Sequence, residues 1–263
     1  MFSIYFTTAR RNLKHKLFSI ISIARPAKTI MMSSSTISLL RSAIMGILLL
    51  FSSFFVFAQD TLFENYSLKS VMVNMSITNI DGKKTVRVVR DTAVKGADLP
   101  TFVRLNNTDN FSNGTIEVML LSRLLPSAEE YARGFIGLAF RINKDNTKFE
   151  SIYIRPTNGR AEDQLRRNHS TQYFSYPDYK FDRLRKEAEG KYESYADMGL
   201  NEWIKMKIVV KNAQAKLYLN DNPQPVLIVN DLKLGATNSG AIGLFVDGGT
   251  DAFFRDIKVI SEN

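Results

Sequence analysis

Apolar and polar residues alternate with a period of two along most of the chain after residue 70. The clearest example is a pair of segments, residues 204–210 and 213–219, joined by a short turn at Asn212. Period two is the repeat of a β-strand with one buried face. The same alternation predicts strands in eight further segments: residues 71–77, 86–88, 115–121, 136–142, 149–155, 226–229, 242–246 and 253–260. In the first of them, Val71 and Val73 are predicted to share one face.

Turn dipeptides separate the predicted strands. Asp81-Gly82 and Asn113-Gly114 are strong hairpin signals. Roughly ten or eleven short strands with hardly any helical periodicity are typical of sandwiches and jelly rolls. We therefore predict an all-β fold, a two-sheet antiparallel β-sandwich of the jelly-roll type, with a closed barrel as the alternative.

One segment, residues 156–200, interrupts this rhythm. It is rich in charged residues, Tyr and Asn, and only residues 182–190 have the pattern of a short helix. Long irregular insertions in compact domains are usually either functional loops or disordered, and the aromatic content argues against disorder. We predict a long, partly helical insertion loop.

Residues 1–58 have the pattern of an export signal. An apolar run of 14 residues, 44–57, follows Arg41 and precedes Ala58. The run is shorter than the roughly 20 residues of a membrane-spanning helix, and the order of basic, apolar and small residues is that of a secretory signal. We predict cleavage after Ala58, with an uncleaved anchor as the alternative, and a single mature domain, residues 59–263, in the periplasm or outside the cell. The leader is long, so the translation start stays open among three further methionines: Met31, Met32 and Met45.

The basic balance of the chain lies in this leader. It carries seven of the 35 Lys and Arg residues and no acidic residue, so 28 basic residues face 26 acidic ones in the remainder. Nucleic acid is therefore not expected as a partner. The chain has no cysteine, which excludes disulfides, thiolate metal sites and Cys nucleophiles. We expect a monomer, no cofactor and no membrane span after cleavage.

The outward faces of two predicted core strands carry small residues beside Tyr and Arg. One strand presents Arg141 with Gly137, and its neighbour presents Tyr153 and Arg155. Guanidinium donors bind hydroxyls, and aromatic rings stack on apolar faces of sugars. We predict that this face is the floor of a carbohydrate site, with an ordinary solvated sheet face as the alternative.

Four motifs carry a resemblance to a known family: RPTN at residues 155–158, RRNHS-x-QY at 166–173, YES at 192–194 and W-x-K-x-KIVV at 203–210. From about residue 111 to 260, the sequence resembles exported bacterial concanavalin A-like jelly rolls, allied to the lectin/glucanase group and to 3-keto-disaccharide hydrolase domains. The resemblance implies two curved sheets whose concave face binds sugar.

The resemblance also implies candidate ligand contacts within those motifs, in addition to Tyr153 and Arg141. They are Arg155, Asn158, Arg167, Asn168, His169, Gln172, Tyr173 and Glu193. Two structural alternatives stay open. Arg155 and Glu193 could form an ion pair that pins the insertion to the sheet, and His169 could satisfy loop carbonyls.

Catalysis and metal binding have fewer signals. The Glu-x-Asp-x-x-Glu pattern of laminarinase-type sandwich glycosidases is absent. Two combinations are the best candidates for an acid and a base: Glu193 with Asp197, or Glu193 with His169. An oxygen-rich loop with Asp247 and Asp251 is a candidate calcium site, although Asp-Gly-Gly is also an ordinary turn.

Three functions are compatible with these patterns. The first is binding of an oligosaccharide or glycan in a concave groove. The second is a glycoside hydrolase or lyase acting through Glu193 and His169. The third is a structural or adhesive scaffold without a small-ligand site.

Overall fold

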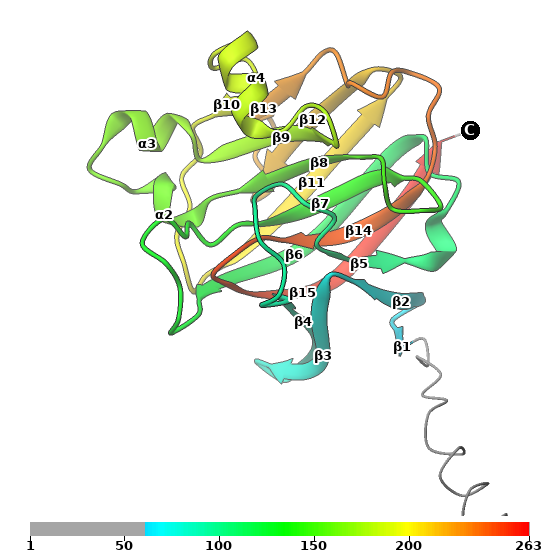
Figure 1. The fold of residues 1–263 in the computed structure, drawn as a ribbon. Helices are drawn as coiled ribbons and strands as arrows, with labels where there is room; N and C mark the ends of the chain where they lie inside the picture. The colour runs from blue at the N-terminus through cyan, green and yellow to red at the C-terminus, as the bar shows by residue number, and fades with distance from the viewer. Residues whose placement is uncertain (1–60, 263) are drawn as a thin grey trace, which may run out of the picture. The chain divides into compact units, whose positions relative to one another are not determined.

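The computed structural model describes residues 61–262, which form two sheets packed face to face (Figure 1). Neighbouring strands run antiparallel in both sheets. The predicted all-β, two-sheet sandwich is confirmed. The predicted signal peptide and its cleavage point lie outside the described residues. None of the helices in residues 61–262 has the length and apolar character that crossing a membrane requires.

One sheet has eight strands. In spatial order they are β1 (Thr61–Phe63), β2 (Tyr66–Val71), β5 (Phe102–Leu105), β14 (Ala241–Val246), β7 (Ile136–Ile142), β8 (Phe149–Ile154), β9 (Thr171–Tyr176) and β10 (Glu193–Ser194). The other sheet has seven: β13 (Leu227–Val229), β12 (Gln214–Leu219), β11 (Trp203–Lys211), β6 (Asn113–Leu124), β15 (Thr250–Glu262), β4 (Lys83–Arg90) and β3 (Val73–Ile80).

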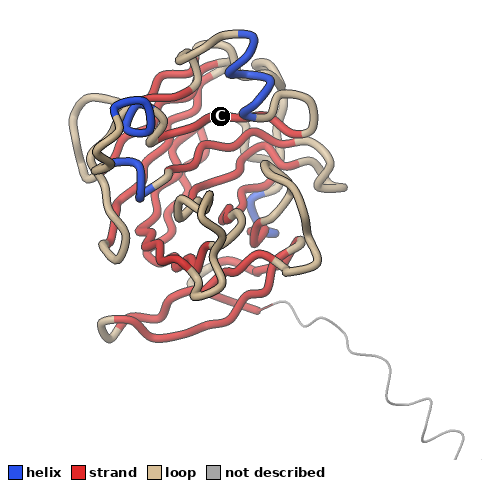
Figure 2. Tube along the Cα trace, turned by 60° about the vertical axis from the view of Figure 1, so that its left-hand side comes forward, coloured by secondary structure: helices blue, strands red, loops and turns tan. Residues whose placement is uncertain are grey.

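The helices of the described residues are all short. They are η1 (Asn106–Thr108), α2 (Pro156–Gly159), α3 (Gln164–Asn168) and α4 (Phe181–Glu187). Helix α2 follows β8 directly and lies beside α3, whereas α4 follows β9 (Figure 1). Figure 2 shows how small this helical part is beside the strands and loops.

The two sheets differ in how their outer faces are covered. In β6 and β11, buried residues alternate with partly exposed ones over most of each strand, which is the pattern of a sheet with one solvated face. In β7, β8 and β14, every residue is buried. The outer face of the eight-stranded sheet is therefore covered around these strands. At the start of α4, the Phe181 N–H donates to Asp98 in the loop after β4. Polar groups under this cover are enclosed rather than solvated.

Aromatic rings fill the space on that outer face. The Tyr153 ring lies 5.8 Å from the Phe174 ring and 5.5 Å from the Phe245 ring, centroid to centroid. Gly137 is paired with Tyr153 across the strands, and a Cβ at Gly137 would lie 2.5 Å from the Tyr153 Cα. The floor predicted to have open room above Gly137 is therefore packed with side chains.

The segment predicted as an irregular insertion, residues 156–200, is more regular than expected. It contains β9 and β10, which extend the eight-stranded sheet beyond β8. The predicted helix at residues 182–190 corresponds to α4. Strand β9 has no period-two signal because its sequence, TQYFSY, places both polar and aromatic residues on each of its two faces.

A second difference occurs at Met72, which separates β2 from β3. Its φ is 52°, in the left-handed region, and the two strands belong to different sheets. Val71 and Val73 were predicted to share one face, and the turn of the backbone between them places them in different sheets instead.

Candidate functional site

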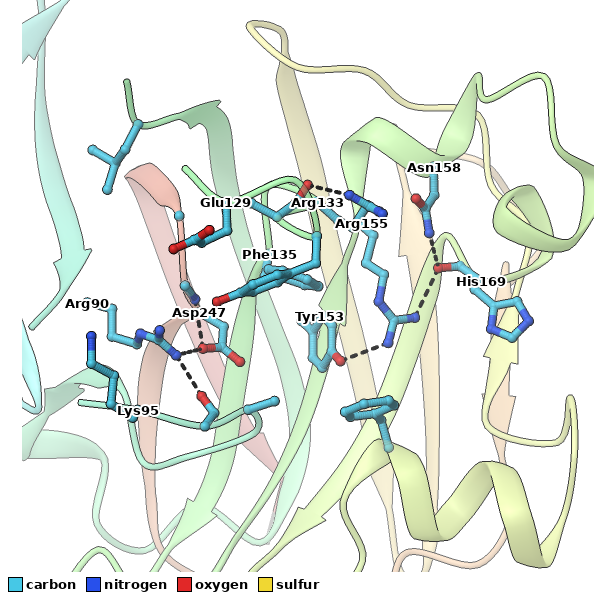
Figure 3. Close-up of a pocket in the computed structure, with 18 of the residues that line it drawn as sticks. Arg90, Lys95, Glu129, Arg133, Phe135, Tyr153, Arg155, Asn158, His169 and Asp247 are labelled. Atoms are coloured by element: carbon cyan, nitrogen blue, oxygen red, sulfur yellow. Dashed lines mark hydrogen bonds and ion pairs between the residues drawn. The ribbon is translucent and has the colours of Figure 1, made fainter. Parts of the chain in front are cut away.

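A cavity of about 690 Å³ lies at the end of the sandwich where β8 and β14 end and β7 begins. Its walls come from four parts of the chain: the loop after β4, the loop between β6 and β7, the insertion after β8, and the turn between β14 and β15. Figure 3 labels ten of the lining residues. The volume falls in the range of roughly 300–1,000 Å³ that is typical of small-molecule sites.

Arg155 fixes the wall that the insertion forms (Figure 3). Its Nη1 donates to the His169 carbonyl at 3.0 Å and to Glu193 Oε1 at 3.1 Å. Its Nη2 donates to the Tyr153 hydroxyl at 2.9 Å and to Gln172 Oε1 at 3.0 Å. Both terminal nitrogens are thus hydrogen-bonded within the protein. Arg155 therefore positions its neighbours rather than presenting a pair of free N–H donors to a ligand. The ion pair with Glu193, one of the two structural alternatives, is present.

Glu193 lies behind the cavity wall, surrounded by the side chains of two arginines and a histidine. Its Oε1 accepts from Arg155, from His169 Nδ1 at 2.8 Å and from Arg185 Nη2 at 2.5 Å, and its Oε2 accepts from Arg185 Nε at 3.0 Å. Burial raises the pKa of Glu193, but the hydrogen bond from Arg185 and the charges of Arg155 and Arg185 outweigh burial and hold the pKa below its usual value. Both Glu193 oxygens already accept hydrogen bonds, the group is ionised, and it lies outside the cavity. It therefore has no proton to donate and does not suit the predicted role of a general acid.

His169 lines the cavity and is oriented by Glu193. Because the ionised carboxylate can only accept a hydrogen bond, the proton of the neutral ring belongs on Nδ1. No protein group of residues 61–262 is hydrogen-bonded to Nε2. The His169 side chain is 17% exposed, and this arrangement is that of a general base held in one tautomer.

Two buried carboxyl groups lie on the opposite side of Tyr153. Asp98 is fully buried, and one of its oxygens, Oδ1, has no hydrogen-bond partner. Burial, together with the charge of Asp247, raises the pKa of Asp98 to about 7, against the hydrogen bond from the Phe181 N–H. Asp247 lines the cavity, and burial raises its pKa as well, with the nearby Arg90 opposing.

The predicted ligand contacts divide into three groups. Four line the cavity: Tyr153, Arg155, Asn158 and His169. Two lie behind it as hydrogen-bond partners of Arg155: Gln172 and Glu193. Four are not part of the cavity lining: Arg141, Arg167, Asn168 and Tyr173.

Arg141 is a structural residue, contrary to its prediction as a ligand contact. Its side chain is buried, and the guanidinium donates to the backbone carbonyls of Ser112, Asn212 and Gly235. A φ of 53° at Arg141, opposite a register shift in β14, interrupts the alternation from which its direction was predicted. Arg141 ties three loops to the end of β7.

The other three outlying candidates also have structural contacts. The Arg167 guanidinium lies 4.9 Å from the Tyr195 ring centroid and donates to the Tyr195 hydroxyl at 2.9 Å. Asn168 is exposed at the end of α3. The Tyr173 hydroxyl donates to the buried Glu150 carboxylate, so that this part of the motif stabilises the sheet.

The acidic residues predicted for calcium are held by arginines. Asp247 pairs with Arg90 at 2.6 Å, and Asp251 pairs with Arg87 at 2.6 Å. Within residues 61–262, no group of three or more His, Asp or Glu side chains is placed to hold a metal ion. Asp197, the second partner considered for Glu193 in catalysis, instead pairs with Arg160 on the surface.

Sequence reasoning missed most of the cationic lining of the cavity. Six such side chains contribute: Arg90, Lys95, Arg133, Arg155, Arg166 and Arg185. Only Arg155 was predicted. The others lie on irregular loops, on short helices or at a strand end, where the period-two pattern does not predict the direction in which a side chain points. Arg166 and Arg185 lie in the insertion among other charged residues. This clustering of charge was the only feature of the sequence that could have indicated their place in the site.

The fold and the cavity define a jelly-roll β-sandwich with a partly open pocket at one end. Residues 78–260 match the family described as 3-keto-alpha-glucoside-1,2-lyase-like domain, and the chain belongs to that family. The resemblance inferred from the RPTN, RRNHS-x-QY, YES and W-x-K-x-KIVV motifs is confirmed. No curated protein matches the sequence.

Several solved structures are similar to this chain at low identity. The carbohydrate-binding module CBM66 from Bacillus subtilis is 16% identical, with 75% of this chain and 98% of that chain covered and a TM-score of 0.48. Domain 4 of AbnA, a GH43 extracellular arabinanase from Geobacillus stearothermophilus in complex with arabinotriose, is 9% identical, with 75% and 84% covered and a TM-score of 0.42. The galectin LEC-6 from Caenorhabditis elegans is 12% identical, with 57% and 86% covered and a TM-score of 0.35.

Proposed function

We propose that the cavity binds a saccharide. The observation that carries this proposal is that a pocket of suitable volume combines polar donors with an exposed apolar rim. Tyr131 and Leu165 line the pocket and are each 63% exposed. An aromatic ring stacks on the apolar face of a sugar, and N–H groups bind its hydroxyls. Membership of a family whose description names a glucoside supports the same ligand class.

A thermal-shift screen against mono- and oligosaccharides tests this function. A ligand that binds only the folded state raises the melting temperature in a saturable way. We expect such a rise for at least one saccharide or keto-saccharide. If no sugar raises the melting temperature, the chain is better described as the scaffold considered above.

A second candidate function is the elimination reaction that the family description names. In a 3-keto glycoside, the carbonyl makes the proton on C2 acidic. His169 is placed to take that proton, the C2–H electrons form a double bond between C1 and C2, and the C1–O bond breaks. The leaving oxygen takes a proton from an acid, for which Asp247, which lines the cavity and whose pKa is raised by burial, is a candidate. The observation that favours this function is the Nδ1 contact of His169 with Glu193.

Loss of deuterium from a 3-keto-α-glucoside labelled at C2 tests the elimination directly. We expect wild-type protein to release the label and to form an unsaturated ketone, and His169→Asn to do neither while still giving a thermal shift with the same sugar. Retention of label release in His169→Asn would remove His169 from the reaction and leave saccharide binding as the function.

We also propose that the protein is exported, on the leader pattern of residues 1–58. Cell fractionation and N-terminal sequencing test this proposal. A mature N-terminus at Gln59 in the periplasm or medium is expected. An intact leader in the cytoplasm would contradict it.

A further inference from the structure

Most arginines around the cavity have a carboxylate partner. Arg90 pairs with Asp247, and Arg155 and Arg185 pair with Glu193. Arg133 and Arg166 line the same cavity, yet no carboxylate of residues 61–262 lies within 4.0 Å of either guanidinium. They are the arginines of the pocket that lack a counter-ion.

Arg133 is held in place as an unneutralised cation. It is half-buried, and its Nη1 donates to the backbone carbonyls of Glu130 and Ala132, while Nε and Nη2 have no hydrogen-bond partner in the described chain. Burial lowers the pKa of Arg133, and the positive charges of Arg166 and Arg155 lower it further, against the smaller opposing effect of the Glu130 charge. Like charges are therefore kept together in the empty pocket, an arrangement that an anion would relieve.

Arg166 contributes a second free guanidinium from a different element. Its single hydrogen bond is a long one, from Nη2 to Asn158 Oδ1 at 3.5 Å. Arg133 comes from the loop before β7 and Arg166 from α3, so two separate parts of the fold bring their donors to one side of the pocket. Paired guanidinium groups bind carboxylate, sulfate and phosphate oxygens strongly.

We infer that the saccharide ligand is acidic, and that a carboxylate, sulfate or phosphate group on the sugar binds between Arg133 and Arg166. This inference rests on the proposed saccharide-binding function and names the class of sugar. Asp91 and Glu129 also line the pocket without an ion-pair partner, and they repel an anion. The acidic group therefore lies on the Arg133 and Arg166 side, with the neutral part of the sugar turned toward Asp91 and Glu129.

Calorimetric titration with matched sugars tests the inference. The probes are uronic acids, 6-sulfates and 6-phosphates of glucose and galactose, each with its neutral parent sugar. We expect the preferred acidic sugar to bind about tenfold more tightly than its parent, and high salt to reduce this preference. The comparison of uronic acid, sulfate and phosphate identifies the anionic group.

Variants separate charge recognition from folding. Arg133→Gln and Arg166→Gln should remove the preference, whereas Arg123→Gln, at an exposed arginine outside the pocket, should keep it. Without ligand, Arg133→Gln should melt close to wild type, because the relief of repulsion offsets the loss of the two hydrogen bonds to backbone carbonyls. Arg133→Lys keeps the charge and should retain part of the preference.

The outcomes are distinct. Acidic and neutral sugars that bind equally well in wild type would overturn the inference and leave the proposed function intact. A preference that survives both Gln substitutions would also overturn it. If no probe binds, neutral or acidic, the proposed function fails together with the inference.

Discussion

At the scale of single side chains, the cavity wall depends on residues that a ligand would not touch. Arg155, Gln172 and Glu193 form a buried hydrogen-bonded group that holds Tyr153 and His169 in place. Removing one partner of a buried ion pair leaves the other charge uncompensated. Substitutions of these buried residues should therefore lower the free energy of unfolding.

Glu193→Gln tests this arrangement. The change keeps the shape of the side chain but leaves Arg155 and Arg185 without a counter-ion, and we expect the free energy of unfolding to fall by about 3 kcal/mol. The matched control is Asp197→Asn, at a carboxylate that is 64% exposed in its ion pair with Arg160, which should change stability by less than about 0.5 kcal/mol. Urea unfolding measures both, and equal effects would contradict the buried-pair account.

Asp98 should make stability depend on pH. Its pKa rises from 3.8 in the unfolded chain to about 7 in the folded one, so its contribution is fully present below the unfolded value and is lost as pH rises through 7. Asp98→Asn imitates the protonated acid. The variant should match wild type near pH 3 and be more stable by roughly 4 kcal/mol near pH 8. Parallel stability curves for the two proteins across this range would contradict the assignment.

Tyr131 should contribute to sugar affinity through stacking. Tyr131→Ala should weaken saccharide binding about fivefold without changing the melting temperature of the free protein. Tyr195→Ala is the control, because Tyr195 is 43% exposed and does not line the cavity. Calorimetric titration of both variants with the same sugar measures the affinities. An equal loss of affinity in both variants would argue against stacking of the sugar on Tyr131.

The sequence predicted the insertion side of the site well and the opposite side poorly. The family motifs brought Arg155, His169 and Glu193 together as candidates, and the structure places them within hydrogen-bonding distance. Arg90 and Arg133 reach the cavity from the end of β4 and from a loop. Their approach depends on the packing of distant segments, which no local pattern encodes.

At the scale of elements, period two identified strands in which apolar residues recur at every second position. Strands β6 and β11 satisfy that condition. Strand β9, with polar and aromatic residues on both faces, does not, and it was absorbed into the insertion. The direction of Arg141 was wrong because a positive φ breaks the alternation locally.

Gly137→Ala tests the packing between neighbouring strands. The added Cβ would meet the Ile152 carbonyl oxygen at 2.3 Å and the Tyr153 Cα at 2.5 Å. These contacts are with backbone, so β7 and β8 have to move apart, and we expect a loss of about 1–3 kcal/mol in the free energy of unfolding. Urea denaturation measures it. Unchanged stability would mean that the strands have more room than the structure gives them.

At the scale of the whole molecule, the two sheets have separate roles on a shared core. The seven-stranded sheet has a solvated outer face, whereas the eight-stranded sheet is covered on its outer face and contributes to the cavity. Buried side chains of both sheets belong to a single hydrophobic cluster. The two sheets should therefore unfold together.

A single cooperative transition is the expected result of urea unfolding. Trp203, the one tryptophan of the chain, lies in β11 and reports on the seven-stranded sheet, while far-UV circular dichroism reports on both sheets. The two midpoints should coincide. Separate midpoints would show that the sheets are independently stable.

The cavity at the end of β8 and β14 is the ligand site that we propose. A direct test is calorimetric titration with a saccharide that raises the melting temperature. The saccharide is titrated into wild type, into Ser127→Trp and into Ser76→Trp. Ser127 lines the cavity, whereas Ser76 is exposed on β3 away from it. We expect one saturable site in wild type and in Ser76→Trp, and none in Ser127→Trp, because the indole fills the cavity. Saturable binding of the same sugar by Ser127→Trp, with wild-type affinity, would contradict the proposed site.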